Sequence, residues 1–415
     1  MKHQVWLWLL LLTLLAGCTA PAAPVAEPLL ILWHSFNGAE RQALQSISDA
    51  FNADNPWGLH LVVEYQDQIF EKVAAATPEQ RPDLVVVWPE MMDIYRQAGL
   101  SADLTPLPPG LHFDTDDLLP MARALFSTQG ELQGIPLGLS TYLIYYNADW
   151  LSDLGYNQQS PTWEDLRRAA CAASDPLKEQ VGLGLPTSAG ALMAQLAASG
   201  AQLSDAEGNY TLFKPETLIA AANLHFLLAD RCAGQYILAA EGVNQLNDHQ
   251  IAMLIDSSQR LMEIEQQRIQ GRRFSLSLGP VPAIDGPGPT LWYGPGLLLL
   301  APEGPRRQAA LQAMNWFISP EAQQIWRTTT QQLPVRRTLL ETYLQDNTDH
   351  TTGENALFAL TLEAADTGQW AIWPNHPNAA GCRAALLEGM FHMGQTTAPE
   401  ALLITIQAQC KGVEP

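Results

Sequence analysis

Leu29-Leu-Ile-Leu-Trp33 is a short apolar run that ends in a polar turn, His34-Ser-Phe-Asn-Gly38. An apolar run of this length, bounded by turn residues, is typical of a buried strand. From about Ala39 to Asn52 the apolar side chains recur with helical spacing, and Asn55-Pro56 ends the predicted helix. We therefore expect a buried strand followed by a helix at the start of the folded part.

The same alternation of strand and helix continues along the chain. Leu61-Val-Val-Glu64 predicts a second strand, residues 69–76 predict a second helix, and Asp83-Leu-Val-Val-Val-Trp88 predicts a third strand. Strands that alternate with helices indicate an α/β fold with a parallel sheet, whose ligand site lies at the carboxyl ends of the strands. These ends carry polar and aromatic residues, among them Trp33-His34, Tyr65-Gln66-Asp67 and Trp88-Pro89-Glu90.

Length and charge limit the possible functions. The chain has 415 residues, too many for one compact core, so we expect two or three lobes. Its 43 acidic and 22 basic residues give a formal charge of −21, which disfavours nucleic acid and anionic lipid headgroups as partners. A strongly anionic solute is also disfavoured, although a single buried arginine could still hold one.

The first residues predict export. A short basic start at Met1-Lys2-His3 precedes an apolar run, Val5 to Leu15, which is too short to span a bilayer and fits a secretory signal. Leu15-Ala-Gly-Cys18 resembles a bacterial lipobox, which implies a signal peptide over residues 1–17 and a lipid on Cys18. Residues 18–28 predict a Pro/Ala-rich tether of roughly 30 Å. The alternative is an ordinary signal peptide with an incidental cysteine.

Four further cysteines, Cys171, Cys232, Cys382 and Cys410, are widely spaced and contain no Cys-x-x-Cys pair, which argues against a zinc site. An even number in an oxidising compartment indicates two disulfides, with three possible pairings. We favour Cys171–Cys232 and Cys382–Cys410, each joining two nearby helices within one lobe. Four buried free thiols are the alternative.

The sequence contains no convincing catalytic constellation. A nucleophile elbow, a Walker loop, an H-E-x-x-H motif and an EF-hand loop are all missing from the sequence, so we expect no enzyme, no metal and no cofactor. Asp116-Asp117 and Glu263 with Glu265 are carboxylate pairs of the kind that a glycosidase needs. Such pairs arise by chance in an acidic chain.

An ordered series of short motifs runs from about Leu29 to the C-terminus. It comprises Trp33-His34, Phe51-Asn52 with Pro56, Asp83 to Trp88, Gly99-Leu100 with Asp103-Leu104, Gly134-Ile-Pro136 before Tyr146-Asn147, Pro161-Thr-Trp163, Ile251 to Ser258, Gly294 with Gly296, Ala310 to Phe317, and Ser319-Pro-Glu-Ala-Gln323 with Trp326 and Pro334. Each motif alone is weak. In this order, behind a lipobox, they resemble an extracellular solute-binding lipoprotein of an ABC transporter, in the family of maltose- and oligosaccharide-binding proteins.

The resemblance implies a periplasmic-binding-protein fold, with two α/β lobes joined by crossing segments around a ligand cleft. Lobe one would comprise residues 29–139 plus 276–334, and lobe two residues 140–275 plus 335–410. The crossings would fall near Leu139-Ser140, Arg273–Ser275 and Pro334-Val335. A solute would bind in the cleft, and the lobes would close around it by hinge motion.

A sugar needs aromatic faces for its C–H surface and hydrogen-bonding groups for its hydroxyls. From the predicted strand ends and crossings we select thirteen candidate ligand residues. In lobe one they are Trp33, His34, Asn37, Asp67, Trp88, Glu90, Trp292 and Tyr293; at the first crossing and in lobe two they are Ser140, Ser257, Ser258, Trp373 and Asn375. Trp33 and Trp88 could instead cap the sheet, and His34 could be a turn residue. Trp163, Trp316 and Trp326 occupy helix-packing positions, so we assign them to the core.

The predicted function is capture of a sugar or related polyhydroxylated solute and its delivery to the transmembrane subunits of an ABC permease. We expect a monomer attached to the extracytoplasmic face of the cell membrane only through its lipid. Two other functions remain open, a surface glycoside hydrolase and a sensory binding lipoprotein that is not coupled to transport.

Overall fold

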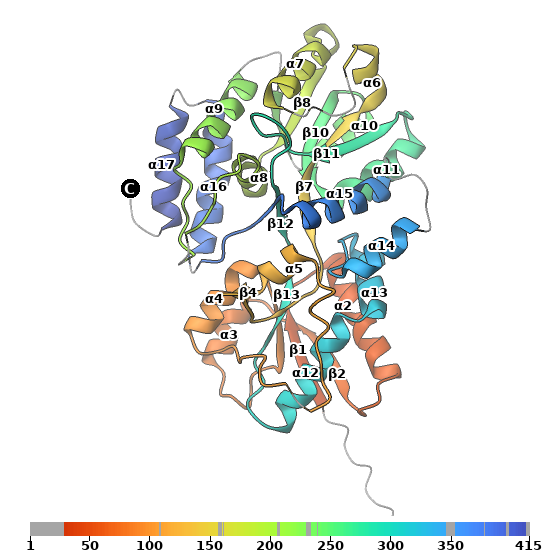
Figure 1. The fold of residues 1–415 in the computed structure, drawn as a ribbon, viewed down its shortest axis with the longest axis vertical. Helices are drawn as coiled ribbons and strands as arrows, with labels where there is room; N and C mark the ends of the chain where they lie inside the picture. Colours follow the sequence, from red (N-terminus) through yellow and green to blue (C-terminus); the bar gives the residue numbers. More distant parts are fainter. Residues whose placement is uncertain are drawn as a thin grey trace, which may run out of the picture.

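The computed structural model describes residues 29–107, 109–156, 160, 162–205, 208–229, 234–238, 240–345, 353–376, 378–395 and 398–411. Two α/β lobes lie one above the other in Figure 1 and are joined by three connecting segments. The predicted signal peptide, the tether and Cys18 lie outside the described residues. Within those residues, no helix is both long and apolar enough to cross a membrane.

Lobe one, the lower lobe of Figure 1, contains a five-stranded sheet in the order β2-β1-β3-β13-β6. Its strands are β1 (Leu29–His34), β2 (His60–Tyr65), β3 (Leu84–Val87), β6 (Ile135–Pro136) and β13 (Gly296–Leu299). β1 runs parallel to β2 and β3, as the sequence predicts, whereas β13 is antiparallel to β3 and β6. A separate hairpin joins β4 (Ser127–Thr128) and β5 (Glu131–Leu132).

Six helices cover this sheet: α2 (Gly38–Ala53), α3 (Ile69–Ala75), α4 (Pro89–Gln97), α5 (Pro120–Leu125), α12 (Pro305–Phe317) and α13 (Pro320–Thr330). The helix predicted over residues 39–52 is α2, and it buries Leu44, Ile47 and Phe51. Ser319 caps the start of α13, because its hydroxyl accepts a hydrogen bond from the Ala322 amide at 3.2 Å. α2 packs against α13 on one side of the sheet.

Lobe two contains seven strands around the long central strand β7 (Ser140–Asn147). The others are β8 (Val181–Pro186), β9 (Gly234–Ile237), β10 (Ile251–Ser257), β11 (Leu276–Pro280), β12 (Thr290–Tyr293) and β14 (Trp370–Ile372). β7 is antiparallel to β10 on one edge and to both β11 and β12 on the other. This sheet is mixed, so the rule for parallel strand ends does not describe it.

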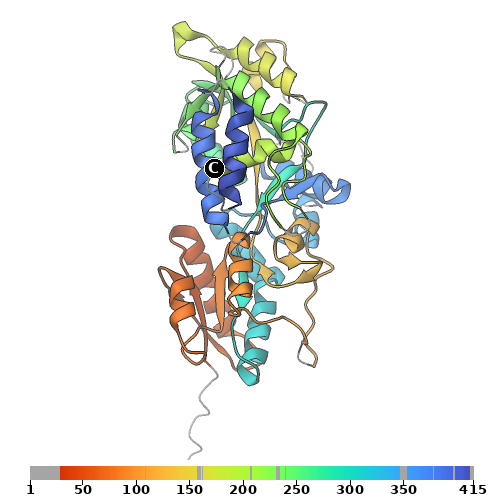
Figure 2. The same cartoon turned by 90° about the vertical axis from the view of Figure 1, so that its left-hand side faces the viewer.

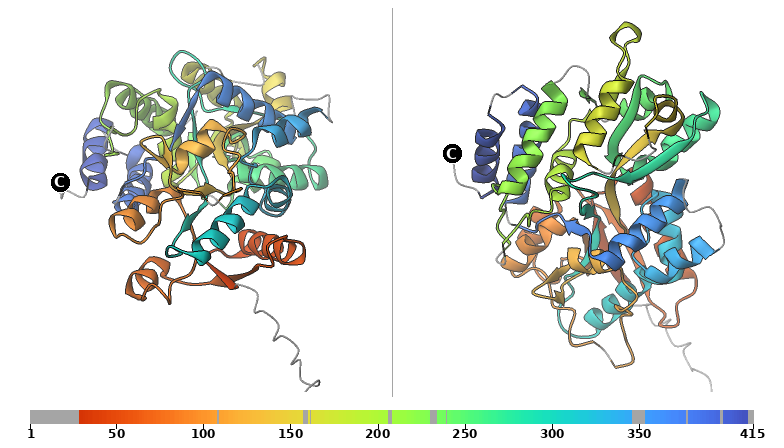
Figure 3. Two further views of the ribbon diagram at one scale, coloured as in Figure 1. Left: turned by 60° about the horizontal axis from the view of Figure 1, so that its bottom comes forward. Right: turned by 45° about the horizontal axis from the view of Figure 1, so that its top comes forward.

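Helices cover both faces of the second sheet. On one face lie α7 (Trp163–Ala173), α8 (Ala189–Ala198), α9 (Pro215–Ala229), α16 (Ala379–Met393) and α17 (Pro399–Cys410), the last three side by side in Figures 2 and 3. The other elements are α6 (Ala148–Asp153), α10 (Gly242–Asn247), α11 (Leu261–Gln270), α14 (Arg337–Gln345) and α15 (Gly353–Thr367), of which α15 packs on β11. Thr162 caps the start of α7, because its hydroxyl accepts a hydrogen bond from the Asp165 amide.

One predicted lobe boundary is wrong. We expected residues 276–334 in lobe one, with a crossing near Arg273–Ser275. Instead β11 and β12 pair with β7, so residues 276–293 belong to the sheet of lobe two, and the chain crosses at Gly294-Pro295 before β13. Local sequence patterns carry no signal for the pairing of β11 and β12 with a strand as distant in sequence as β7.

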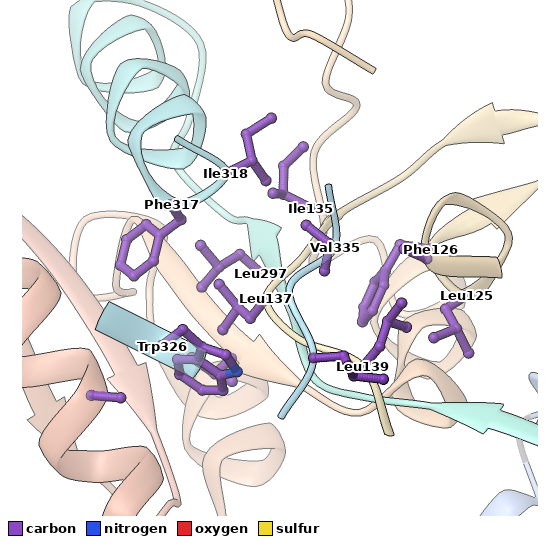
Figure 4. Close-up of a cluster of buried hydrophobic side chains, with 14 of the residues drawn as sticks. Leu125, Phe126, Ile135, Leu137, Leu139, Leu297, Phe317, Ile318, Trp326 and Val335 are labelled. Atoms are coloured by element: carbon purple, nitrogen blue, oxygen red, sulfur yellow. The ribbon is translucent and has the colours of Figure 1, made fainter. Parts of the chain in front are cut away.

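The three connections meet at the base of the cleft. Leu139 forms a β-bridge with Leu333, and the Leu137 amide donates to the Pro295 carbonyl at 2.8 Å. A Cβ on Gly294 would lie 1.9 Å from the carbonyl oxygen of Gly138, so only glycine permits this close approach of two backbones. Figure 4 shows the surrounding apolar cluster, in which Leu137, Leu139, Leu297, Trp326 and Val335 are fully buried.

The structure contains the predicted Cys382–Cys410 disulfide, which joins α16 to α17 within lobe two. Cys171 is also disulfide-bonded. Its predicted partner, Cys232, lies outside the described residues, so the Cys171–Cys232 pairing stays a prediction.

Candidate functional site

A cavity of about 350 Å³ lies between the lobes, within the size range of small-molecule sites. Seven residues line it: Trp88 and Glu90 from lobe one, and Tyr142, Gly190, Tyr293, Trp373 and Arg383 from lobe two. Four of the seven carry aromatic rings, and the others contribute one carboxylate, one guanidinium and a glycine. We call this cavity the cleft pocket.

The wall in lobe one is built where β3 ends and α4 begins. Trp88 occupies the N-cap position of α4, Pro89 follows at the first helical position, and Glu90 lies in the first turn. An acid in the first turn of a helix is stabilised by the helix dipole. The ring of Phe36 meets Trp88 edge-to-face at 5.9 Å between centroids, which fixes the indole at the rim of the cleft pocket.

In lobe two, β7 and β12 carry a pair of tyrosines. The rings of Tyr142 and Tyr293 lie 5.7 Å apart, and the hydroxyls of Tyr293 and Ser257 share a hydrogen bond of 2.6 Å. Burial raises the pKa of both tyrosines, so their hydroxyls stay protonated and can donate. A Cβ on Gly190, at the start of α8, would lie 2.0 Å from the Tyr142 hydroxyl, so glycine there admits the phenol.

Trp373 and Arg383 form the remainder of the lobe-two wall. The Trp373 indole donates to the hydroxyl of Tyr210 at 3.2 Å, and the guanidinium carbon of Arg383 lies 4.5 Å from the Trp373 ring centroid. Only 3% of Trp373 is exposed, with Arg383 over one face of its ring. Arg383 also forms an ion pair with Glu90, which joins the two lobes across the cleft pocket.

His34 lies behind the wall of lobe one, at the end of β1. It is 1% exposed, its Nδ1 accepts the Phe36 amide at 3.1 Å, and its ring meets Tyr65 edge-to-face. Burial, with a smaller contribution from the positive charge of Arg41, lowers the pKa of His34 to about 4. The imidazole is therefore neutral at pH 7.

Asp256 lies behind the wall of lobe two, at the end of β10. Burial raises the pKa of Asp256 to about 6, although the Ser257 amide and the charge of Arg260 oppose that rise. Its Oδ1 accepts from the Ser257 amide at 2.7 Å, and its Oδ2 has no hydrogen-bond partner among the residues that the structure describes. Asp256 is 5% exposed and does not line the cleft pocket.

The structure brings four of the thirteen predicted ligand residues into the cleft pocket, namely Trp88, Glu90, Tyr293 and Trp373. Three others are buried near this lining: His34 contacts the Phe36 ring that meets Trp88, Ser257 bonds the Tyr293 hydroxyl, and Ser140 lies opposite Tyr293 in the sheet. Ser258 accepts the Thr141 amide at 3.1 Å and so holds β7 to β10.

The other five predicted residues lie outside the cleft-pocket lining. Trp33 donates a hydrogen bond to Glu64 between β1 and β2, and Asp67 pairs with Lys72. Asn37 is exposed before α2, and Asn375 is half-buried in the loop after Trp373. Trp292 is fully buried, and its indole donates to Thr290 at 2.7 Å. Trp292 and Tyr293 extend from the sheet of lobe two, not from lobe one as predicted, because β12 pairs with β7.

Sequence reasoning missed Tyr142, Gly190 and Arg383. Tyr142 stands in an aromatic stretch whose alternation was visible, but its direction depends on which side of β7 faces the cleft. Gly190 looks like an ordinary residue of an apolar helix. Arg383 is the only basic residue between Arg337 and Lys411 apart from histidines, and this isolation is the one signal that could have drawn attention to it.

Comparison with known proteins identifies relatives of this fold. The family described as bacterial extracellular solute-binding protein matches residues 46–352. The sn-glycerol-3-phosphate-binding periplasmic protein UgpB of Escherichia coli (strain K12) is 26% identical over 147 residues, which are 32% of this chain and 33% of the relative. The chain thus matches about a third of the length of such curated relatives.

Solved structures extend the likeness over nearly the whole chain. MalE, the sugar-binding protein of Xanthomonas citri, superposes with a TM-score of 0.77 at 15% identity, covering 92% of this chain and 96% of MalE. UgpB from Mycobacterium tuberculosis, in complex with glycerophosphocholine, gives a TM-score of 0.71 at 18% identity. The superposition covers 93% of this chain and 98% of that UgpB. These superpositions confirm the predicted two-lobed α/β fold.

Proposed function

The chain belongs to the family of bacterial extracellular solute-binding proteins, and we propose that it is the solute-binding component of an ABC importer. It would act outside the cytoplasm, capture a sugar or related polyhydroxylated solute by lobe closure, and deliver it to the permease. The neighbouring structures with sugar ligands, such as a cyclo/maltodextrin-binding protein with maltotetraose, support this choice of solute class.

The composition of the cleft pocket is the observation that carries the proposal. Rings from both lobes line it, and aromatic faces pack well against the C–H surface of a sugar. The hydroxyls of Tyr142 and Tyr293, together with Glu90 and Arg383, supply donors and acceptors on both sides. Because the lining comes from both lobes, a bound solute would favour the closed state.

We propose binding without catalysis. A glycosidase needs two carboxyl groups about 5–9.5 Å apart across its substrate, whereas Glu90 is the single carboxylate among the described residues that line the cleft pocket. Three of the four carboxylates noted in the sequence are engaged elsewhere, since Asp117 pairs with Arg336, Glu263 with Arg260 and Glu265 with Arg268, and Asp116 does not line the cleft pocket.

Arg383 favours a second candidate solute class, glycerol phosphate or a glycerophosphodiester. A guanidinium binds phosphate oxygens well, and the UgpB proteins are named for, or crystallised with, such solutes. Here Arg383 already pairs with Glu90, so we rank this class below neutral polyhydroxylated solutes.

A thermal-shift screen tests the proposal, because a ligand that binds only the folded state raises the melting temperature. The screen uses maltotetraose, ribitol, sn-glycerol 3-phosphate and glycerophosphocholine, followed by calorimetric titration of each hit. We expect a concentration-dependent rise with a neutral solute. Turnover of a sugar without a saturable shift would contradict a pure binding function.

The lipid anchor is a separate part of the proposal. Cys18→Ala should move the protein from the membrane fraction to the soluble fraction without changing its melting temperature, because the anchor would lie outside the folded lobes. Retention of the variant in the membrane fraction would count against a lipid on Cys18. Size-exclusion chromatography of the released protein should give a monomer.

A further inference from the structure

The two charged residues that line the cleft pocket neutralise each other. Glu90 extends from α4 in lobe one and Arg383 from α16 in lobe two, and their side chains form an ion pair across the cleft. The Glu90 side chain is 11% exposed, whereas that of Arg383 is 48% exposed. Trp373 lies under the guanidinium and fixes its position.

We propose that Glu90 determines the solute specificity of the cleft pocket: by holding Arg383, it selects neutral polyhydroxylated solutes against anionic ones. The inference rests on the proposed function and names the charge class of the solute. Specificity of this kind comes from a repulsive element as much as from attractive contacts.

An anion at Arg383 would meet a penalty in either of two arrangements. If it displaced Glu90, a nearly buried carboxylate would lose its one ion-pair partner among the described residues, and an unpaired buried charge is costly. If it bound beside Glu90, two negative groups would share one guanidinium, and like charges at short range repel. No second cation lines the pocket among its described residues to offset either penalty.

A neutral diol meets neither penalty. Its hydroxyl hydrogens can donate to the carboxylate of Glu90 while its oxygens accept from the guanidinium of Arg383. The ion pair then becomes a hydrogen-bonding platform with no net charge, and the solute bridges the two lobes where they already meet. The same platform would strengthen lobe closure around a bound diol, because each hydroxyl contacts both lobes.

Glu90→Gln tests the assignment, because the amide keeps the size of the side chain and removes its charge. The probes are inorganic phosphate and sn-glycerol 3-phosphate, titrated calorimetrically at low ionic strength. The freed guanidinium should bind each anion about 10- to 100-fold more tightly than the parent does, the value of one charge-assisted hydrogen bond. The double variant Glu90→Gln/Arg383→Gln should lose that gain.

Asp93→Asn is the matched control. It removes an acid that pairs with an arginine, Arg96, in the same helix α4, but Asp93 does not line the cleft pocket. It should leave anion affinity at the parental value. If Glu90→Gln fails to fold, as judged by its melting curve, Glu90→Ala with the same probes replaces it.

Two results would overturn the proposal: a Glu90→Gln variant that binds phosphate and sn-glycerol 3-phosphate no more tightly than the parent, or an equal gain in Asp93→Asn. The outcome is independent of the proposed function, which depends on whether the parent binds maltotetraose or ribitol. If the parent binds a neutral solute while Glu90→Gln gains no anion affinity, only the proposed role of Glu90 in specificity is refuted. A gain in Glu90→Gln, with no neutral solute bound by the parent, refutes the proposed solute class alone.

Discussion

The two walls of the cleft differ in both architecture and chemistry. Lobe one contributes two neighbouring residues, Trp88 and Glu90, from one strand end and the helix that follows it. Lobe two contributes five residues from five separate elements or loops, and these supply the hydroxyls and, among the described lining residues, the one cation. Neither wall alone offers an aromatic face, an acid and a base, so the proposed solute would have to contact both lobes to meet all three.

Substitutions in the hydrophobic cores behind the two walls should lower the stability of the protein without changing its affinity for solute. We expect the largest loss of stability in the core of lobe one. Trp326 is fully buried in the apolar cluster of Figure 4. Its indole donates to Gln332 at 3.2 Å. Trp326→Ala should lower the free energy of unfolding by about 3–5 kcal/mol, because the cavity cannot close completely. Denaturant unfolding measures the loss, and titration of the folded variant should give an affinity close to that of the parent.

The buried histidine of lobe one should make the protein less stable in acid. Between pH 6.5 and 4 the unfolded chain takes up a proton on His34, whereas the folded state does not, so stability falls as the pH falls. The loss attributable to His34 should reach about 3 kcal/mol by pH 4.

His34→Asn isolates this effect, since an asparagine can accept the amide two residues ahead, as His34 does from Phe36, but does not titrate. Stability curves of parent and variant at several pH values should diverge as the pH falls below 6.5. Parallel curves would show that His34 is protonated equally in the folded and unfolded states.

The buried acid of lobe two should act in the opposite direction. Between pH 4 and 6 folded Asp256 keeps its proton while the unfolded chain releases it, so stability falls as the pH rises through this range. Asp256→Asn removes this pH dependence of stability. Between pH 4 and pH 8 the free energy of unfolding of the variant should therefore rise by about 2–3 kcal/mol relative to that of the parent. Thermal unfolding at both pH values measures the gain; an equal difference at both would contradict it.

The contrast between the walls also explains what the sequence could predict. Trp88 and Glu90 follow a strand that is recognisable from its apolar run, and parallel strands bring their carboxyl ends to one edge. The lobe-two wall depends on antiparallel pairing across long sequence separations, such as Tyr293 opposite Ser140. No local pattern encodes that pairing, so the side of β7 that carries Tyr142 could not be predicted; Gly190 and Arg383 lie on helices α8 and α16, whose approach to the cleft is also set by tertiary packing.

The same limit explains the misplaced boundary and Trp292. A strand pattern at residues 290–293 predicts that successive side chains point to opposite sides of a sheet, but not which of the two sheets contains the strand. Once β12 joins β7, Tyr293 faces the cleft and its neighbour Trp292 faces the core, because successive side chains of a strand point to opposite sides. One residue of the predicted pair therefore lines the cleft pocket and the other is structural.

Trp373 tests whether the aromatic wall of lobe two contributes to affinity. Trp373→Ala should weaken solute binding by about 1–3 kcal/mol, from lost apolar burial and a lost ring contact, and it also removes the support for Arg383. Calorimetric titration with the solute identified in the screen measures the loss. Trp316→Ala, which alters a half-buried tryptophan in lobe one outside the cleft pocket, is the control.

At Tyr293 the contribution of the aromatic ring to solute affinity can be separated from that of the hydroxyl. Tyr293→Phe keeps the ring against Tyr142 but removes the hydroxyl that bonds Ser257 and faces the cleft pocket. We expect a loss of about 0.5–1.5 kcal/mol in solute affinity, the value of one neutral hydrogen bond.

The double variant Tyr293→Phe/Ser257→Ala provides the check. If the hydroxyl acts on the solute directly, the second substitution should add little to the loss in affinity. If it acts only by holding Ser257, Ser257→Ala alone should weaken binding as much as Tyr293→Phe, and the direct contact would be refuted.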